Sequence, residues 1–240
     1  MKILIFSDIH ANFEALKELL GREKFDYSIF LGDAVDYGPQ PAETLDLVME
    51  NSDVRLMGNH DRAVAYDEDC KCALEMHDLS EYTRENISKM LLSKEDINHL
   101  KKFRENQIIE IENLKIYAAH ASPYNNLYGY LFSTEAEMVW KDKSLKQYDY
   151  ITVGHTHYMM MYRNRILNPG SSGQPRDGVW MPMYMTFDTD SLEYRFHRFR
   201  YDYMKTVHML EEIVNDEKFL AKLKEFYIPA LSELIKSSVK

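Results

Sequence analysis

The feature that most constrains this chain is a pattern in which short apolar strands end in side chains that can bind metals. The clearest case is the run from Tyr148 to Val153, where β-branched residues predict a buried strand and Gly154 marks the break after it. His155 and His157 follow directly, so both imidazoles can point into one space beyond the strand end. Taken alone, such a pair is weak evidence for a site and is more often two polar residues in a loop.

The same arrangement occurs at four other places along the chain. In open α/β sheets the ligand site lies beyond the carboxyl ends of the strands, so we expect the polar residues at the five strand ends to meet. Coincidence is a poor explanation for five repeats of one pattern. The other apolar runs span 2–7, 27–31, 53–57 and 114–119, and the candidate ligands are Asp8, His10, Asp33, Asn59, His120, His155 and His157.

The ligand types indicate which ions such a site would hold. A mixed set of carboxylate and imidazole groups suits Mn²⁺, Fe, Zn²⁺, Co²⁺ or Ni²⁺ better than Ca²⁺, which prefers a shell of oxygen atoms. Seven candidate ligands are too many for one ordinary site and about the right number for two.

The motifs also occur in a characteristic order along the chain. They are Asp8-x-His10, Gly32-Asp33, Gly58-Asn59-His60-Asp61, His120 and Gly154-His155-x-His157. This ordered set resembles the calcineurin-like metallophosphoesterase superfamily over about residues 1–200. Asn168-Pro169-Gly170-Ser171, which follows, resembles the small bacterial and archaeal phosphodiesterase branch. Ala11 stands where Gly often follows the first His, and Ser172 stands where an aliphatic residue is frequent; neither departure removes a ligand.

The resemblance implies two divalent transition metal ions per chain, with manganese the first choice and iron, zinc, nickel or cobalt as alternatives. Asp33 would bridge the two ions, and a carboxylate suits that position because it has two oxygens. Such a pair, ~3.5–4 Å apart, lowers the pKa of a bridging water and clamps the attacking and leaving oxygens of an in-line displacement. By resemblance, the first site comprises Asp8, His10, Asp33 and His157, and the second comprises Asp33, Asn59, His120 and His155.

His60 and Asp61 are the predicted catalytic residues. His60 adjoins the ligand Asn59 but is not needed as a ligand, so it is suited to protonating the leaving oxygen or stabilising transition-state charge. Asp61 is expected to orient it. Ser171 and Ser172 have no base partner in the sequence, so we interpret their loop as positioning ligands or substrate.

The predicted function is therefore a dinuclear-metal phosphoesterase that uses a metal-bridging hydroxide, with a phosphodiester of a small or nucleotide-like substrate as the first choice. Phosphomonoesterase, protein phosphatase and dinucleoside polyphosphate hydrolase activities remain alternatives within the superfamily. A catalytically inactive metal-binding scaffold is the alternative outside enzymes, but a scaffold has no reason to retain seven ligands and His60.

The net charge bears on the partners. The chain has 29 basic and 39 acidic residues, a formal charge of −10, which disfavours long nucleic acid as a substrate. A dication site still attracts a small phosphate ester, because bound metals dominate the local field. We expect a monomer or homodimer, with no membrane partner, because no apolar run reaches the ~18 residues of a membrane span.

The two cysteines, Cys70 and Cys72, are too few for a disulfide scaffold and too closely spaced for a relaxed disulfide. With His77 they could be interpreted as a metal site that lacks a fourth ligand, but free thiols in a helical insert are the preferred interpretation. With no secretory signal at Met1, the expected location is the cytoplasm.

Strands alternating with helices over 1–200 predict a layered α/β/β/α sandwich, two sheets flanked by helices, as one metallophosphoesterase domain. Helical spacing at 73–91 and 94–103 predicts a helical insert over 62–103, either a cap above the site or a decoration packed elsewhere. The aromatic loop 124–130 could stack a nucleobase or pack locally. Residues 201–240 predict a helical extension on the same domain, broken at Asn215 and Pro229, with a dimer contact as the alternative use of its apolar stripe.

Overall fold

The computed structural model describes residues 1–229 and contains two five-stranded sheets, ordered β10-β9-β1-β2-β3 and β4-β5-β6-β8-β7. The strands are β1 (Lys2–Phe6), β2 (Tyr27–Phe30), β3 (Val54–Arg55), β4 (Asn106–Ile111), β5 (Leu114–Ala119), β6 (Tyr150–Thr152), β7 (Met159–Tyr162), β8 (Ile166–Pro169), β9 (Met183–Asp188) and β10 (Glu193–Arg198). The helices are α1 (Phe13–Arg22), α2 (Pro41–Asn51), α3 (Asn59–Tyr66), α4 (Leu74–Thr83), α5 (Lys89–Leu91), α6 (Lys94–Leu100), α7 (Ala136–Lys141), α8 (Tyr203–Ile213) and α9 (Glu217–Glu225), with a π-helical turn η1 (Arg84–Ser88) and a 3₁₀ turn η2 (Ser144–Gln147).

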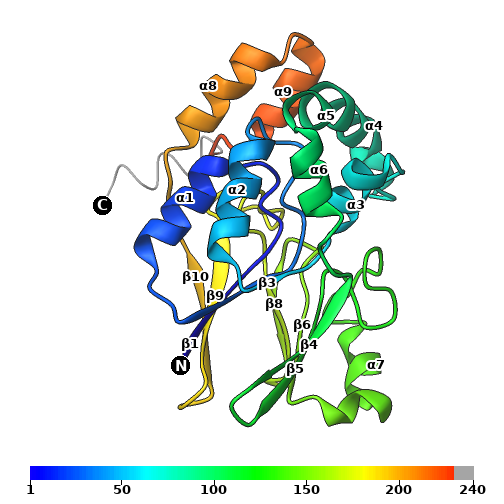
Figure 1. Cartoon of the computed structure of the whole chain (residues 1–240), viewed down its shortest axis with the longest axis vertical. Coiled ribbons are helices and arrows are strands. Elements are labelled where there is room, and N and C mark those ends of the chain that lie inside the picture. The colour runs from blue at the N-terminus through cyan, green and yellow to red at the C-terminus, as the bar shows by residue number, and fades with distance from the viewer. Residues whose placement is uncertain (230–240) are drawn as a thin grey trace.

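The two sheets face each other across an apolar layer, and helices cover their outer faces. Side chains that alternate along β1, such as Ile3 and Ile5, pack against Ile116 and Ala118 of β5 between the sheets. The opposite face of β1 packs on α1 and α2, and the outer face of the second sheet packs on α7 (Figure 1). The predicted α/β/β/α sandwich is confirmed.

Strand direction explains why the strand ends meet. The strands β1, β2 and β3 run parallel in one sheet, and β5, β6 and β8 run parallel in the other. Parallel strands of one sheet have their carboxyl ends at one edge, so the loops after β1, β2 and β3 emerge together, as do those after β5 and β6.

The insert is helical, as predicted, but it begins earlier than the sequence indicated. Residues 59–61, which precede the predicted insert of 62–103, already form the first turn of α3, with Gly58 as its N-cap. The predicted helix over 73–91 is formed by α4, η1 and α5, so a π-helical turn interrupts the α-helical hydrogen bonding. Ser93 caps α6, with its hydroxyl accepting the N–H of Asp96 at 3.2 Å.

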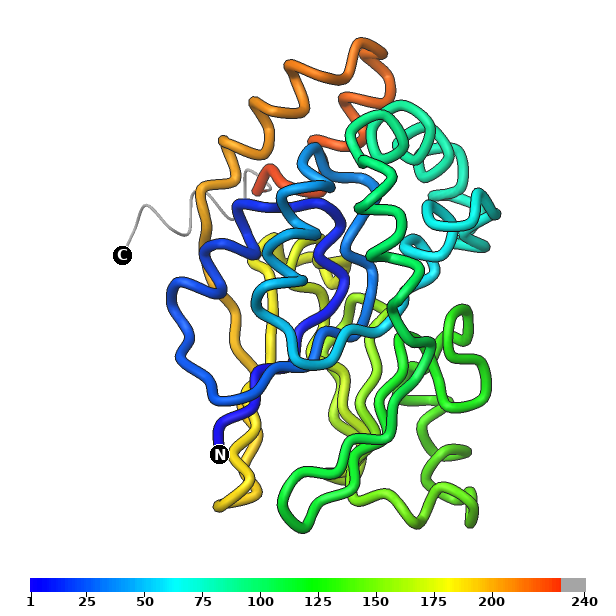
Figure 2. The backbone as a smooth tube through the Cα atoms, in the orientation of Figure 1, coloured from blue at the N-terminus to red at the C-terminus, as the bar shows by residue number. Residues whose placement is uncertain are grey.

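The C-terminal segment packs beside the insert. Side chains of α4, η1, α8 and α9 share one apolar cluster, and Figure 2 shows α8 and α9 arching over the same end of the molecule as the insert. The predicted break at Asn215 is confirmed; the predictions for 230–240, including the stripe at Leu231, Leu234 and Ile235, lie outside the described residues. Among residues 1–229, no helix is long and apolar enough to cross a membrane.

Asn12 connects three distant parts of the chain and is fully buried. Its amide nitrogen donates to the carbonyl of Gly173 at 2.7 Å and to the Tyr201 hydroxyl at 2.9 Å. Its oxygen accepts the N–H of Ala15 at 3.3 Å, which caps α1, and the hydroxyl of Thr206 at 3.1 Å. One amide therefore joins the start of α1 to the 173 loop and to α8.

Asn12→Ala should lower the free energy of unfolding by about 1–3 kcal/mol, because it leaves buried donors and acceptors unpaired. The matched control is Asn51→Ala, which removes one half-exposed bond from the Asn51 amide to the Leu47 carbonyl and should change stability by about 0.5 kcal/mol or less. Urea unfolding of both variants measures the difference. Equal losses would contradict the connecting role of Asn12.

Candidate metal centre

All seven predicted ligands lie at the edge where the strand ends emerge, and all are buried. Their coordinating atoms form two clusters, each with its atoms within 4.8 Å of one another. Asn59 adjoins the second cluster, with its side-chain oxygen 3.1 Å from Nε2 of His120. The clusters are Asp8, His10 and His157, and Asp33, His120 and His155.

Asp33 lies between the two clusters. Its Oδ2 is 3.7 Å from Nε2 of His10 in the first cluster and 3.4 Å from Nε2 of His120 in the second. Its other oxygen accepts the backbone N–H of His60 at 2.9 Å, which fixes the carboxylate at the start of α3. This is the position that a bridging ligand requires.

Three histidines have one ring nitrogen tied to the backbone. Nδ1 of His10 is 3.2 Å from the carbonyl of Val35, and Nδ1 of His120 is 2.9 Å from that of Leu31. Nδ1 of His157 likewise meets the carbonyl of Gln174. Since a carbonyl can only accept, Nδ1 carries a proton, and in the neutral form of each ring, which metal ligation requires, Nε2 presents a lone pair to the centre.

Two further observations show that these groups fit cations. Nε2 of His10 and Nε2 of His157 face each other at 3.2 Å, although each presents a lone pair. Oδ1 of Asp8 and Nε2 of His155 are buried and have no hydrogen-bond partner within residues 1–229. Lone pairs that converge with no proton to share are costly unless a cation lies among them, so the donor set fits divalent metal ions.

Burial and charge set the protonation of the ligands. Burial holds the pKa of His10, His155 and His157 well below the ordinary histidine value, which keeps them neutral as ligation requires. Burial alone would raise the pKa of Asp33, but the nearby His120 and His60 hold it well below its usual range.

The backbone is strained at the same positions. Five of the ligand residues have positive φ, a region that non-glycine residues rarely adopt. Such strain persists only where the surrounding structure fixes it, and it concentrates at functional sites. The values are 55° for Asp8, 51° for His10, 62° for Asp33, 66° for His155 and 63° for His157.

Two positions of the motifs require glycine, because neighbouring atoms approach the backbone too closely for a side chain. A Cβ on Gly58 would lie 1.9 Å from Oδ1 of Asp33, and a Cβ on Gly154 would lie 2.1 Å from the hydroxyl oxygen of Ser7. Any larger residue would displace a ligand or the strand end that carries it.

The Asn168–Ser172 loop holds the ligand loops in place. The amide of Asn168 donates to the carbonyl of Gly154 at 2.7 Å, and the hydroxyl of Ser171 donates to the carbonyl of Asp8 at 2.7 Å. The N–H of Ser172 donates to the carbonyl of Ser7 at 2.8 Å. The serines are therefore engaged with the backbone, which agrees with a positioning loop.

The structure corrects the predicted partner of His60. Asp61 does not contact the imidazole; its carboxylate accepts the N–H groups of Asp33, Ala34 and Gly58 at 2.8, 2.8 and 3.0 Å. The side chain of a residue in the first turn of a helix points back toward the preceding loop, which is why Asp61 lies away from its neighbour. Asp36 takes the expected place instead, with Oδ2 3.0 Å from Nδ1 of His60.

The charged neighbours of His60 favour its protonated form. Burial opposes the imidazolium, but Asp33 and the hydrogen bond to Asp36 outweigh burial and raise the pKa of His60 to about 9. Ser88 in the insert donates to the other oxygen of Asp36 at 2.9 Å, so the carboxylate is held from both sides.

The insert packs directly against this side of the site. Besides Ser88, Thr83 accepts the N–H of Tyr37 at 3.3 Å. The amide nitrogen of Asn59 donates to the carbonyl of Cys70 at 2.8 Å, so the insert also orients a candidate ligand.

Cys70 and Cys72 are free thiols, as expected, but they lie in the segment before α4 rather than in a helix. His77 contacts Asp69 rather than either cysteine.

Arg176 is a residue that the sequence analysis missed. It donates to the side-chain oxygen of Gln174 at 2.9 Å, and its guanidinium lies 5.9 Å from the ring of Tyr37. That ring is 5.0 Å from His10 and 4.9 Å from His60, so a cation borders the centre. Its position five residues after Ser171 was the available signal.

Three aromatic side chains form an exposed patch that starts at the centre. The ring of Tyr130 lies 4.3 Å from that of His155. Phe132 is parallel to Tyr130 at 6.0 Å, and Tyr158, directly after His157, meets Phe132 edge-on at 6.0 Å. The exposed fractions are 39%, 39% and 41%, so this aromatic patch of Tyr130, Phe132 and Tyr158 is open to solvent beside the ligands.

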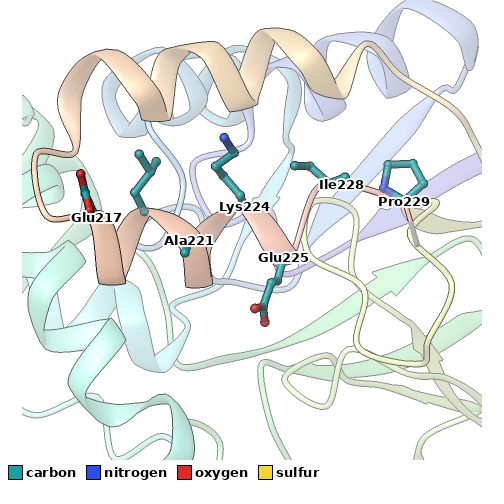
Figure 3. A pocket seen from close by; sticks show the side chains of 7 residues that line it. Glu217, Ala221, Lys224, Glu225, Ile228 and Pro229 are labelled. Carbon is teal, nitrogen blue, oxygen red and sulfur yellow. The ribbon is translucent and has the colours of Figure 1, made fainter. Parts of the chain in front are cut away.

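A separate hollow of about 590 Å³ lies along α9 (Figure 3). Its lining includes Leu220, Lys224 and Ile228 and contains none of the candidate ligands. It extends to Pro229, where the described residues end, so we assign it no ligand.

Comparison with known proteins places this geometry in a family. Residues 1–192 match the calcineurin-like phosphoesterase superfamily domain. An uncharacterized protein of Methanocaldococcus jannaschii is 30% identical over 92% of this chain and 98% of its own length. The crystal structure of a metallophosphoesterase from Sphaerobacter thermophilus is 26% identical, with a TM-score of 0.77 over 93% of this chain and 98% of that one. A hypothetical protein from Pyrococcus horikoshii shares the fold, with 20% identity and a TM-score of 0.77 over 92% of this chain and 97% of its own.

The domain match covers most of the chain, and the M. jannaschii relative matches it over nearly its full length. The resemblance predicted from the ordered motifs is confirmed. The chain belongs to the calcineurin-like phosphoesterase superfamily, whose members are metal-dependent hydrolases of phosphate esters.

Proposed function

We propose that this protein is a dinuclear-metal phosphodiesterase that acts on a small, nucleotide-like ester. The observation that carries the proposal is the pair of buried ligand clusters joined by the carboxylate of Asp33. Asp8, His10 and His157 would hold one ion with Asp33, and Asn59, His120 and His155 would hold the other with the same carboxylate. When bound, two such ions supply Lewis acidity and a nucleophile derived from water.

The remaining charged groups fit the other needs of phosphate-ester cleavage. His60 with Asp36 behind it is a protonated imidazole at neutral pH, suited to donating a proton to the leaving oxygen. Arg176 at the border of the centre offers a planar cation that suits a non-bridging phosphate oxygen.

The aromatic patch supports a planar group on the substrate. Three exposed rings beside the centre provide a surface on which a nucleobase or similar ring can stack. A diester carries a second substituent that a simple phosphate monoester lacks, and the Asn168–Ser171 motif resembles a phosphodiesterase branch. The aromatic patch, which can hold such a substituent, and the Asn168–Ser171 motif therefore favour a nucleotide-like diester over a monoester.

Replacing the bridging residue should remove both metals, whereas replacing a ligand of one cluster should remove one. Asp33→Asn is therefore expected to lose both ions and nearly all activity, and Asp8→Asn to lose mainly one, because Oδ2 of Asp33 lies near a histidine nitrogen of each cluster. Elemental analysis with diester hydrolysis measures both, and chelation of the unsubstituted protein should abolish its activity. Two retained metals and near-normal turnover in Asp33→Asn would refute the bridge.

His60→Ala should keep the metals but slow the hydrolysis of alkyl esters by about 10²–10⁴-fold, the contribution typical of a general acid. The loss should shrink for nitrophenyl esters, whose leaving group needs little protonation. His77→Ala, in the exposed part of the insert, is the control and should have no effect. An equal loss for both ester types would point to charge stabilisation instead of proton donation.

Asp36→Asn should move the alkaline limb of the pH–rate profile for alkyl esters to lower pH. The active form is the imidazolium, which is lost as pH rises through the His60 pKa, and removing the Asp36 charge lowers that pKa. Asp53→Asn is the matched control, because that carboxylate accepts hydrogen bonds from Ser28 away from the centre, and it should leave the limb in place. If the alkaline limb did not move in Asp36→Asn, Asp36 would not be a group that raises the pKa of His60.

Tyr130→Leu should raise KM for an aromatic diester by about 2- to 10-fold, which corresponds to one stacking contact. Tyr130→Phe keeps the ring and should keep KM. The control is Tyr124→Leu, an exposed aromatic whose hydroxyl contacts Asp142 outside the patch. An alkyl diester should not distinguish the variants; if it does, the patch affects the centre itself rather than substrate binding.

A further inference from the structure

The only two cysteines of the chain lie beside the candidate acid His60. Coordinating atoms of Cys70, Cys72 and His60 all lie within 4.8 Å of one another. The hydroxyl of Ser80 is 3.3 Å from Sγ of Cys70 and 3.3 Å from Nδ1 of His60, so the Nδ1 edge of the imidazole faces the thiols. This group is separate from the two oxygen- and nitrogen-lined clusters, which contain no sulfur.

The ligand types distinguish this group from the dinuclear centre. Two thiolates and an imidazole select soft or borderline cations such as Zn²⁺ and Cd²⁺, whereas carboxylates favour harder ions. Cys70 is fully buried and Cys72 is half-buried, which gives a cation a path to the sulfurs from solvent.

The local backbone allows the small adjustment that a cation needs. The two sulfurs are 2.7 Å apart, and a tetrahedral ion with metal–sulfur bonds of ~2.3 Å holds its sulfurs roughly 3.8 Å apart. Metal binding would therefore increase the distance between the two sulfurs by about an ångström. Both cysteines lie in a segment outside the helices, between Tyr66 at the end of α3 and Leu74 at the start of α4. Cys70 is anchored through its carbonyl to Asn59, so the shift is expected at the half-buried Cys72.

We propose that Cys70, Cys72 and His60 form a third metal site, which takes one soft divalent cation and inhibits the enzyme when filled. A cation that binds Nδ1 replaces the proton that Nδ1 shares with Asp36, and that proton leaves to solvent. The ring that remains is a neutral imidazole, which gives up its second proton far less readily than an imidazolium does, so His60 no longer serves as the proton donor. The inhibitory part rests on the proposed role of His60, whereas the binding part does not.

Cadmium is the probe for binding, because thiolate ligation of Cd²⁺ produces an ultraviolet charge-transfer band. No other cysteine is present, so this band reports only the proposed site, even if Cd²⁺ also enters the dinuclear centre. Titration of reduced, manganese-loaded protein should show the band saturating at one Cd²⁺ per chain. It should vanish in a Cys70→Ser, Cys72→Ser double variant and persist in Lys71→Ala, the matched control between the two positions.

The binding claim is overturned if the unsubstituted protein gives no band. It is also overturned if a thiol count on purified, denatured protein finds both cysteines oxidised, since a disulfide would exclude the metal. Both outcomes are independent of any hydrolytic activity, so they separate failure of this site from failure of the proposed function.

The inhibitory claim is tested with two ester types, each protein being compared with itself without Cd²⁺. In the unsubstituted protein, Cd²⁺ should suppress alkyl-ester hydrolysis by at least tenfold more than nitrophenyl-ester hydrolysis, reproducing the selectivity expected of His60→Ala. The double serine variant should lose that selectivity and show at most the uniform inhibition caused by exchange at the dinuclear centre. The same selectivity in both proteins would overturn the claim.

Discussion

The hydrogen bonds of the Asp61 carboxylate hold the site together. One side chain accepts backbone N–H groups from the loop after β2 and from Gly58 after β3, and so joins the loop that carries Asp33 to the start of α3, which carries Asn59. The N–H of His60, one residue away, then fixes the free oxygen of Asp33. Without these bonds, Asp33 would not be held at the junction of the two clusters.

This arrangement places several energetically unfavourable features at one edge of the molecule. Five ligand residues have strained backbones, and buried carboxylates and imidazoles crowd together without enough protons to pair them. The apolar layer between the two sheets, with its counterparts under α1, α2 and α7, supplies the stability that offsets them. Hydrogen bonds from the Asn168–Ser172 loop and from Asn12 then hold the loops at the strand ends in place.

Much of the metal centre could be predicted from the sequence, because an apolar strand that ends beside Gly and a metal ligand is recognisable from neighbouring residues alone. Asp8, Asp33 and His155 could be placed at one edge from strand direction alone. The partner of His60 could not, because sequence adjacency favoured Asp61, whereas the first turn of α3 directs that side chain backward and the chain path brings Asp36 to the imidazole.

Arg176, the rings of Phe132 and Tyr158, and the position of the thiols beside His60 escaped prediction for the same reason, since each reaches the centre only through tertiary folding. Tyr130 ends the aromatic loop 124–130, whereas the rings of Phe132 and Tyr158 have no distinctive sequence context and join the patch only through their contacts in the folded chain. Cys70 and Cys72 looked like two thiols in a helix until the path of the insert brought them to His60.

X-ray diffraction from manganese-loaded crystals, recorded at the metal absorption edge, tests the central claim most directly. The account predicts two anomalous peaks ~3.5–4 Å apart, with the Asp33 carboxylate bound to both. One peak, or two peaks that do not share Asp33, would contradict it.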